Sequence, residues 1–181
     1  MSTKSPAIRI GFTGSHGTGK TTLATELAIK LDMPFIEERA RIFADMGFDM
    51  NTSASLQTQL LMLLDQIAAE SNPFSYWITD RILLDYLAYS VNTDQALNQD
   101  TVRLLESNLY WLMQNRYTHV FLVPVGKIAL VSDTLRPDDI AYQERIDTTI
   151  RFYLEKMKIP YHTIESSSLE DRMDEVLEVV Y

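Results

Sequence analysis

A glycine-rich octapeptide near the amino end constrains the fold more than any other feature. Its sequence, Gly14-Ser15-His16-Gly17-Thr18-Gly19-Lys20-Thr21, fits the G-x-x-x-x-G-K-[ST] pattern of a phosphate-binding P-loop. The glycines allow a tight turn in which successive backbone N–H groups face one anion, and Lys20 reaches the outer phosphates as a point charge. The octapeptide follows an apolar run, Ala7–Thr13, and opens a segment with leucines at helical spacing, Lys20–Leu31. This strand–loop–helix context predicts a nucleoside triphosphate site.

The residues of the P-loop have separate expected tasks. Thr21 offers a hydroxyl to Mg²⁺, and the helix that opens at Gly19 directs the positive end of its dipole at the phosphates. The residues expected to bind the nucleotide within this segment are Gly14, Ser15, His16, Gly17, Thr18, Gly19, Lys20, Thr21 and Thr22.

Strand-like and helical segments alternate along the rest of the chain. The expected strands are Ala7–Thr13, Pro34–Glu37, Tyr76–Thr79, His119–Pro124 and Tyr161–Ile164. The expected helices are Lys20–Leu31, Ser55–Glu70, Leu83–Tyr89, Val102–Met113, Ile140–Lys156 and Leu169–Val180. Such alternation predicts an α/β fold of three layers, in which helices cover both faces of a parallel sheet. Trp77 and Trp111 are interpreted as core residues.

Charged residues follow the second and third expected strands. Ligands in open α/β sheets bind outside the carboxyl ends of the strands. Glu37 or Glu38 would accept a proton from a substrate hydroxyl or hold a sugar, and Arg41 would neutralise charge. Asp80 ends an apolar run as a Walker B aspartate does, and such a carboxylate holds Mg²⁺ directly or through water. The alternatives are the charged first turn of a surface helix for 37–41 and an ordinary helix N-cap for Asp80.

Two further basic segments bear on the type of reaction. Arg81 stands where many ATP-hydrolysing machines place a second carboxylate, so transfer to a bound hydroxyl is favoured over ATP-driven mechanics. Arg136 and Arg145 lie in a stretch, about 126–145, that would act as a lid over the phosphates. Such a lid excludes water and stabilises charge on the transferring group. The alternative is a solvated loop that enters a helix.

Taken in order, these segments resemble the ribosylnicotinamide kinase domain, one of the small P-loop kinase-like AAA domains. That group is similar to deoxynucleoside and nucleoside monophosphate kinases. The resemblance covers roughly Ile8–Ile164 and rests on the P-loop, Glu38-Arg39-Ala40-Arg41 as E-x-x-R, Asp80-Arg81 and Asp133-Thr134-Leu135-Arg136. The chain departs from the family at Thr134, where glycine is common, and at Glu37, which leaves the position of the base open.

The resemblance implies a P-loop NTPase fold with a parallel core of about five strands and Mg-ATP as the phosphate donor. It also implies a lid around Lys127–Arg145 and an acceptor pocket lined by Glu38, Arg41 and the helix Ser55–Glu70. Gln57 and Gln59 on that helix either meet a nucleobase or face water.

The leading hypothesis is an ATP-dependent kinase that moves the γ-phosphate to a hydroxyl or phosphate of a nucleoside, nucleotide or similar small molecule. The expected catalytic residues are Lys20, Glu38, Asp80 and Arg136. Arg145 is expected to bind the nucleotide, and Thr21 and Asp80 are expected to bind Mg²⁺. The residues expected to bind the acceptor are Glu37, Arg41 and Arg81. One alternative is an ATP-binding regulator or slow ATPase that acts through a protein partner. Another is a kinase that acts on a modified base or end in a nucleic acid.

Composition limits the partners and the location. Sixteen Lys and Arg against twenty-five Asp and Glu give a net charge of −9, which counts against coating a nucleic acid. The absence of cysteine excludes disulfides, Cys-ligated zinc and thiol catalysis. The segment Met1–Ile10 lacks the features of a secretory signal, and the longest apolar run, Leu60–Leu64, is far shorter than the roughly 20 residues of a membrane span. We expect one cytoplasmic domain over residues 1–181, with no membrane contact and no particular oligomeric state favoured.

Overall fold

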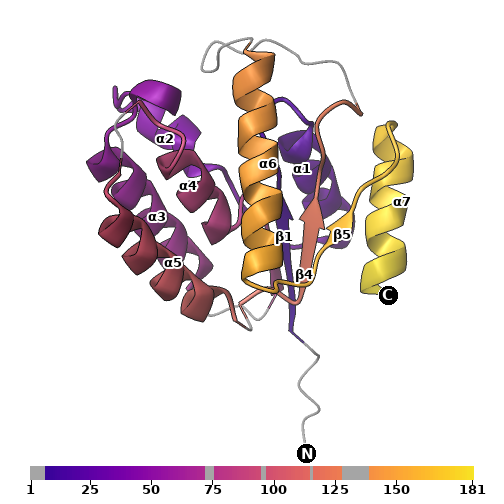
Figure 1. Ribbon diagram of the computed structural model, residues 1–181. Helices are drawn as coiled ribbons and strands as arrows, with labels where there is room; N and C mark the ends of the chain where they lie inside the picture. The colour runs from indigo at the N-terminus through magenta and orange to yellow at the C-terminus, as the bar shows by residue number, and fades with distance from the viewer. Residues whose placement is uncertain (1–6, 72–75, 95–96, 115, 128–138) are drawn as a thin grey trace, which may run out of the picture.

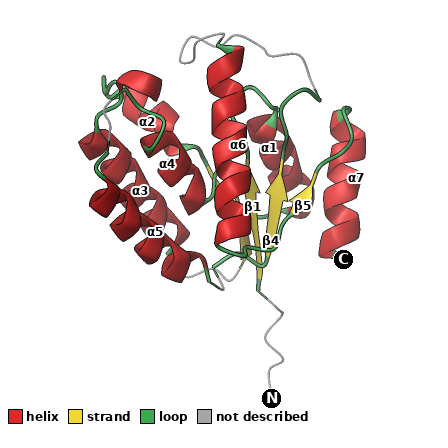
Figure 2. Ribbon diagram, viewed as in Figure 1, coloured by secondary structure: helices red, strands yellow, loops and turns green. Residues whose placement is uncertain are grey.

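Five parallel strands form the centre of the fold (Figures 1 and 2). The computed structural model describes residues 7–71, 76–94, 97–114, 116–127 and 139–181. The strands are β1 (Ile8–Thr13), β2 (Phe35–Ile36), β3 (Tyr76–Thr79), β4 (His119–Leu122) and β5 (His162–Thr163). Their order in the sheet is β2-β3-β1-β4-β5, and each neighbouring pair is parallel. Each expected strand is present, although all but β3 are shorter than predicted.

The helices that surround the sheet agree with most of the predicted segments. They are α1 (Lys20–Leu31), α2 (Arg39–Asp45), α3 (Leu56–Glu70), α4 (Leu83–Ser90), α5 (Gln99–Met113), α6 (Ile140–Lys156) and α7 (Leu169–Val180), with a 3-10 turn at Asn51–Ser53. The sequence did not predict α2 as a separate helix, because no residue of α2 is buried and it therefore has no apolar periodicity. Within the described ranges, no helix has the length and apolar character needed to cross a bilayer.

Each face of the sheet packs against its own group of helices. Ile10, Phe12 and Phe121 point to one face, where they contact α1 and α7 in a single apolar cluster. Val120 and Leu122 point to the other face and join the side chains of α3, α4, α5 and α6. Side chains that alternate along β4 therefore serve two separate cores, which is the period-two pattern of a buried strand. This confirms the expected three-layer architecture.

The two tryptophans of the chain have opposite environments. Trp77 on β3 is buried, as predicted. Trp111 on α5 is 79% exposed, so its interpretation as a core residue is wrong. Only Leu109 and Met113 of α5 are buried, and Trp111 lies on the opposite side of that helix.

The order of the strands determines which loops meet. Because β3 lies between β2 and β1, the segments that follow these three strands share one edge of the sheet. The backbone N–H of Asp80 donates to the carbonyl of Ile36 at 3.1 Å, and that of Val123 donates to Thr13 at 2.9 Å. The P-loop, the acidic segment after β2 and the Asp80-Arg81 pair are thereby placed side by side.

Candidate active site

The P-loop follows β1 and has the backbone that its glycines permit. Gly14, Gly17 and Gly19 have φ angles of 137°, 68° and 82°. These values lie where L side chains are strained. At Gly14, a Cβ would also lie 2.4 Å from the carbonyl oxygen of Val123. The loop therefore requires glycine on both conformational and steric grounds.

Lys20 is enclosed by the loop that it ends. Its Nζ donates to the carbonyl of Ser15 and lies 3.3 Å from Thr18 Oγ1. The side chain is buried, and burial lowers the pKa of Lys20 to about 7, with the charge of Arg81 acting in the same direction. A polyphosphate placed beside this ammonium group would favour its charged form.

Thr21 and Asp80 form the site expected for a cation. Thr21 Oγ1 donates to Asp80 Oδ2 at 2.7 Å, while Asp80 Oδ1 is buried with no hydrogen-bond partner among the described residues. Burial raises the pKa of Asp80, and Glu38 acts in the same direction. These are the hard oxygen donors that Mg²⁺ prefers. No group of three or more His, Cys, Asp or Glu side chains suited to a metal occurs in the described part of the chain.

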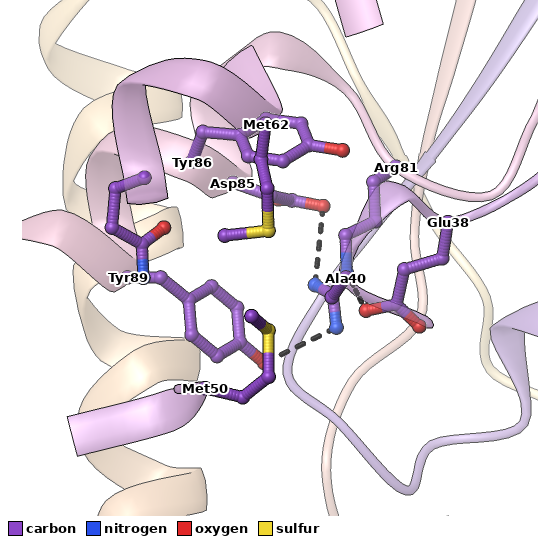
Figure 3. Close-up of a pocket in the computed structure, with 9 residues that line it drawn as sticks. Glu38, Ala40, Met50, Met62, Arg81, Asp85, Tyr86 and Tyr89 are labelled. Carbon is purple, nitrogen blue, oxygen red and sulfur yellow. Dashed lines mark hydrogen bonds and ion pairs between the residues drawn. The ribbon is translucent and has the colours of Figure 1, made fainter. Parts of the chain in front are cut away.

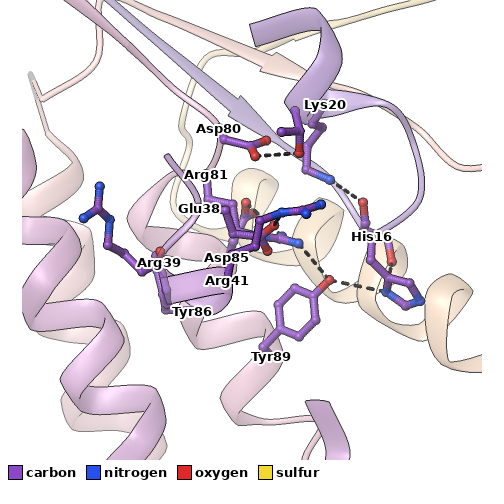
Figure 4. A network of polar contacts seen from close by, with 12 residues as sticks. His16, Lys20, Glu38, Arg39, Arg41, Asp80, Arg81, Asp85, Tyr86 and Tyr89 are labelled. Atoms are coloured by element: carbon purple, nitrogen blue, oxygen red, sulfur yellow. Dashed lines mark hydrogen bonds and ion pairs between the residues drawn. The ribbon is translucent and has the colours of Figure 1, made fainter. Parts of the chain in front are cut away.

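Glu38 and Arg81 form a buried ion pair at the centre of the site (Figure 4). Glu38 ends the segment after β2 and is the N-cap residue of α2, while Arg81 follows β3. Arg81 Nε donates to Glu38 Oε1 at 2.5 Å, and its Nη1 donates to the carbonyl of Gly14 at 3.2 Å. Burial alone would lower the pKa of Arg81, but nearby carboxylates, Glu38 first, raise it well above its usual value. Arg81 thus joins the P-loop to the acidic segment.

A small pocket adjoins this ion pair (Figure 3). Its cavity volume is about 30 Å³, which is enough to hold a water molecule. Gln59 contributes a buried Oε1 that has no hydrogen-bond partner among the described residues. The pocket combines polar groups with apolar walls, and the lining residues are Glu38, Ala40, Met50, Gln59, Met62, Arg81, Asp85, Tyr86 and Tyr89.

Asp85 is a site residue that the sequence analysis missed. It accepts a hydrogen bond from Thr13 Oγ1, and its Oδ2 lies 3.5 Å from Arg81 Nη1. Burial raises the pKa of Asp85 to about 6, although Arg81 acts against this shift. A signal was present in the sequence, because Asp85 is an acidic residue in the first turn of the helix that follows the Asp80-Arg81 pair. Tyr89, also missed, accepts from Arg81 Nη2 at 3.2 Å.

The structure brings some of the predicted residues together and separates others. The group that converges is Lys20, Thr21, Glu38, Asp80 and Arg81. Five predicted residues lie outside the pocket lining. Glu37, Thr22 and Gln57 are exposed. Arg41 lies 4.0 Å from Glu38 Oε2, and the Arg145 guanidinium lies 5.4 Å from the centre of the Tyr142 ring. Arg136 and the lid segment 128–138 lie outside the described residues.

A family model described as AAA domain matches residues 9–172. Curated protein sequences give no significant match.

Three solved structures share the fold of the chain. The NadR protein in complex with NR is 18% identical with a TM-score of 0.74, and the match covers 96% of this chain but 52% of NadR. Deoxyadenosine kinase from M. mycoides is 17% identical with a TM-score of 0.67, covering 95% of this chain and 98% of the kinase. Thymidylate kinase from Candida albicans is 14% identical with a TM-score of 0.68, and the match covers 98% of this chain and 92% of that kinase. These matches confirm the predicted three-layer P-loop fold.

Proposed function

Since the chain belongs to the AAA domain family, as a small P-loop kinase-like domain, we propose that it is a phosphotransferase. It would move the γ-phosphate of ATP to a hydroxyl or phosphate of a nucleoside, nucleotide or similar small molecule. The observation that carries this proposal is the buried Glu38–Arg81 pair, which lines a pocket and is bonded to the first residue of the P-loop. A pocket joined to a P-loop in this way supports a second substrate beside the donor.

The donor side of the site would use three residues. Lys20 would pair with the β- and γ-phosphates, and Thr21 and Asp80 would hold Mg²⁺ through their oxygens. When bound, Mg²⁺ neutralises charge on the β- and γ-phosphates. Asp80 is suited to this task because one of its oxygens is buried without a hydrogen-bond partner among the described residues.

Glu38 is the residue best placed to act on the acceptor. Glu37 is exposed and Asp80 is bonded to Thr21, whereas Glu38 is buried and lines the pocket. The acceptor oxygen would bond to the γ-phosphorus as the bond from that phosphorus to the β–γ bridging oxygen breaks. Glu38 would take the hydroxyl proton, and ADP would leave with the bonding electron pair. Arg81 would hold the Glu38 carboxylate in position through its bond to Oε1.

The pocket walls favour an acceptor that contains a flat ring. Tyr86, Tyr89 and Met62 supply apolar surfaces, and the unpartnered Oε1 of Gln59 can accept from an N–H group. A nucleobase offers both features. Because the cavity volume is only about 30 Å³, the pocket would have to widen for a nucleoside to enter. The similarity to deoxyadenosine kinase, thymidylate kinase and NadR in complex with NR supports the same acceptor class.

A panel of nucleosides and nucleoside monophosphates with γ-labelled ATP tests this function. We expect label transfer to at least one acceptor, and the Glu38→Gln variant should lower kcat by roughly 10²- to 10⁴-fold, as is usual for loss of a general base. Glu37→Gln is the matched control and should stay close to the wild-type rate, because Glu37 is exposed. Transfer to no acceptor would contradict the kinase proposal. ATP turnover that responds only to an added protein would instead favour a regulator.

A further inference from the structure

Two peptide groups of the P-loop are held by side chains from distant helices. Gln143 on α6 donates from Nε2 to the carbonyl of His16 at 2.7 Å, across 127 residues of sequence. Arg172 on α7 donates from Nη1 to the carbonyl of Thr18 at 2.9 Å, across 154 residues. Both side chains are buried. These contacts lie outside the Glu38–Arg81 pocket and have no part in the chemistry described above.

The two carbonyls belong to the peptides that precede Gly17 and Gly19. In a trans peptide, the C=O and the following N–H point in opposite directions. A donor that holds the His16 carbonyl therefore directs the Gly17 N–H away from α6, and one that holds the Thr18 carbonyl directs the Gly19 N–H away from α7. Glycine crosses easily between backbone conformations, so a glycine-rich loop alone does not fix these directions.

The Ser15 carbonyl provides a contrast within the same loop. It accepts from Thr18 Oγ1 at 3.1 Å and from Lys20 Nζ, which are groups of the loop itself. Its peptide therefore has local partners. The His16 and Thr18 carbonyls differ, since their side-chain donors come from α6 and α7.

Arg172 is itself held by a further hydrogen bond, and both donors lie in packed surroundings. Arg172 Nε donates to the carbonyl of Ser166 at 2.9 Å. Glu175, one turn later on α7, accepts from the backbone N–H of Ser166 at 2.8 Å and so holds the same segment. Beside Gln143, the Tyr142 ring lies 5.7 Å from the His16 ring. The donors are thus part of packed structure, as preorganisation of a binding site requires.

We propose that Gln143 and Arg172 are positioning residues that orient the peptides before Gly17 and Gly19. Their N–H groups then face the polyphosphate before it binds, so binding does not have to order them. This inference rests on the proposed function, because it assumes that a triphosphate occupies the P-loop. Loss of either donor should weaken polyphosphate binding roughly tenfold, the scale of one hydrogen bond that fixes a peptide.

The test uses protein labelled with ¹⁵N only at glycine. The chain has six glycines, so each amide can be followed in a simple NMR spectrum during titration with Mg²⁺ and AMP-PNP, and separately with inorganic tripolyphosphate. Gln143→Met should reduce the ligand-induced chemical shift change of the Gly17 amide, and Arg172→Met should reduce that of the Gly19 amide. Each variant should also bind the polyphosphate with lower affinity. Arg172→Lys should restore part of the Gly19 shift, because an ammonium group also donates to a carbonyl. Gln99→Met and Arg103→Met, at exposed positions of α5, are matched controls that should behave as wild type.

The outcomes separate this inference from the proposed function. If no glycine of the wild-type protein shifts with either ligand, the triphosphate site itself is wrong. If the wild type shifts and both variants give the same Gly17 and Gly19 shifts and the same affinity, the positioning role is overturned. A lower melting temperature with unchanged glycine shifts would also overturn it, since that result indicates a structural role alone. Should Arg172→Met fail to fold, Gln143→Met and the Gly17 amide decide the matter.

Discussion

Two cations and three carboxylates share the buried space behind the P-loop. They are Lys20, Arg81, Glu38, Asp80 and Asp85. Burial of charged groups is costly unless they are paired, and the close contacts of Arg81 with Glu38 and Asp85 offset part of that cost. In spite of these pairs, burial lowers the pKa of Lys20 to about 7 and raises the pKa of Asp80, and perturbed pKa values are typical of groups placed for function.

Lys20→Met should separate ligand binding from stability. Methionine removes the charge that would meet the phosphates, so affinity for tripolyphosphate should fall roughly a hundredfold or more. The same change removes a buried group whose pKa is lowered to about 7, so the free energy of unfolding at pH 7 should rise. Isothermal calorimetry and urea denaturation measure the two effects. A variant that binds normally, or that is less stable than wild type, would contradict this account.

The sequence predicted individual site residues where a local motif named them. Lys20 and Thr21 follow from the P-loop, and Asp80 follows from its place after an apolar strand. It did not predict that Glu38 and Arg81 pair, because they are 43 residues apart and only the sheet order brings them together. Gln143 is further still from its P-loop partner, and no pattern near it indicates that contact.

Among the elements, α3 connects the pocket to the opposite end of the sheet. Gln59 near its start lines the pocket, and Glu70 is its last residue. Glu70 accepts from Tyr117 Oη at 2.7 Å and from Arg116 Nε at 2.7 Å, both of which precede β4. The end of α3 is thereby fixed to the amino end of a central strand.

Glu70 should make the stability of this connection depend on pH. Burial raises the pKa of Glu70 from 4.5 to about 7, although the bonds from Gln66, Tyr117 and Arg116 act in the opposite direction. Between these two values the folded protein binds more protons than the unfolded chain, so stability falls as the pH rises. The contribution is complete below pH 4.5 and is lost above pH 7, with a total on the order of 3 kcal/mol.

Comparison with Glu70→Gln isolates this effect from the other buried carboxyl groups. The free energy of unfolding should be measured from pH 4.5 to 8 for both proteins. We expect the wild-type value to decline relative to that of the variant across this range. Curves that remain parallel would show that Glu70 keeps the same charge throughout and would disprove the assignment.

Elements with a strong apolar period were predictable and short elements were less so. The bounds of α1, α6 and α7 agree with the prediction to the residue, because each buries one continuous apolar face. The seven-residue α2 lacks such a face. The sequence left two interpretations for residues 37–41, either a carboxylate after β2 that acts on the substrate or the charged first turn of a surface helix. Both interpretations of Glu38 contain part of the result, since it is the N-cap residue of α2 and also lines the pocket.

On the scale of the whole molecule, the positive charges that the described residues bring to the site are few and enclosed. Lys20, Arg81 and Arg172 are 4%, 4% and 3% exposed, while the chain carries a net charge of −9. A nucleic acid gains affinity from many exposed cations that release counterions. A single polyphosphate needs only the donors of one loop. The distribution of charge therefore favours a small ligand over a polymer.

Ligand-linked stability tests this preference on the intact protein. A ligand that binds only the folded state at one hundred times its Kd raises the free energy of unfolding by about 2.7 kcal/mol. For a chain of this size, that corresponds to an increase in Tm of about 5–10 °C. Mg-ATP and tripolyphosphate should produce such shifts in thermal denaturation, whereas a single-stranded oligonucleotide at low salt should produce none. An equal shift with the oligonucleotide, lost as salt is raised, would instead indicate a nucleic acid substrate.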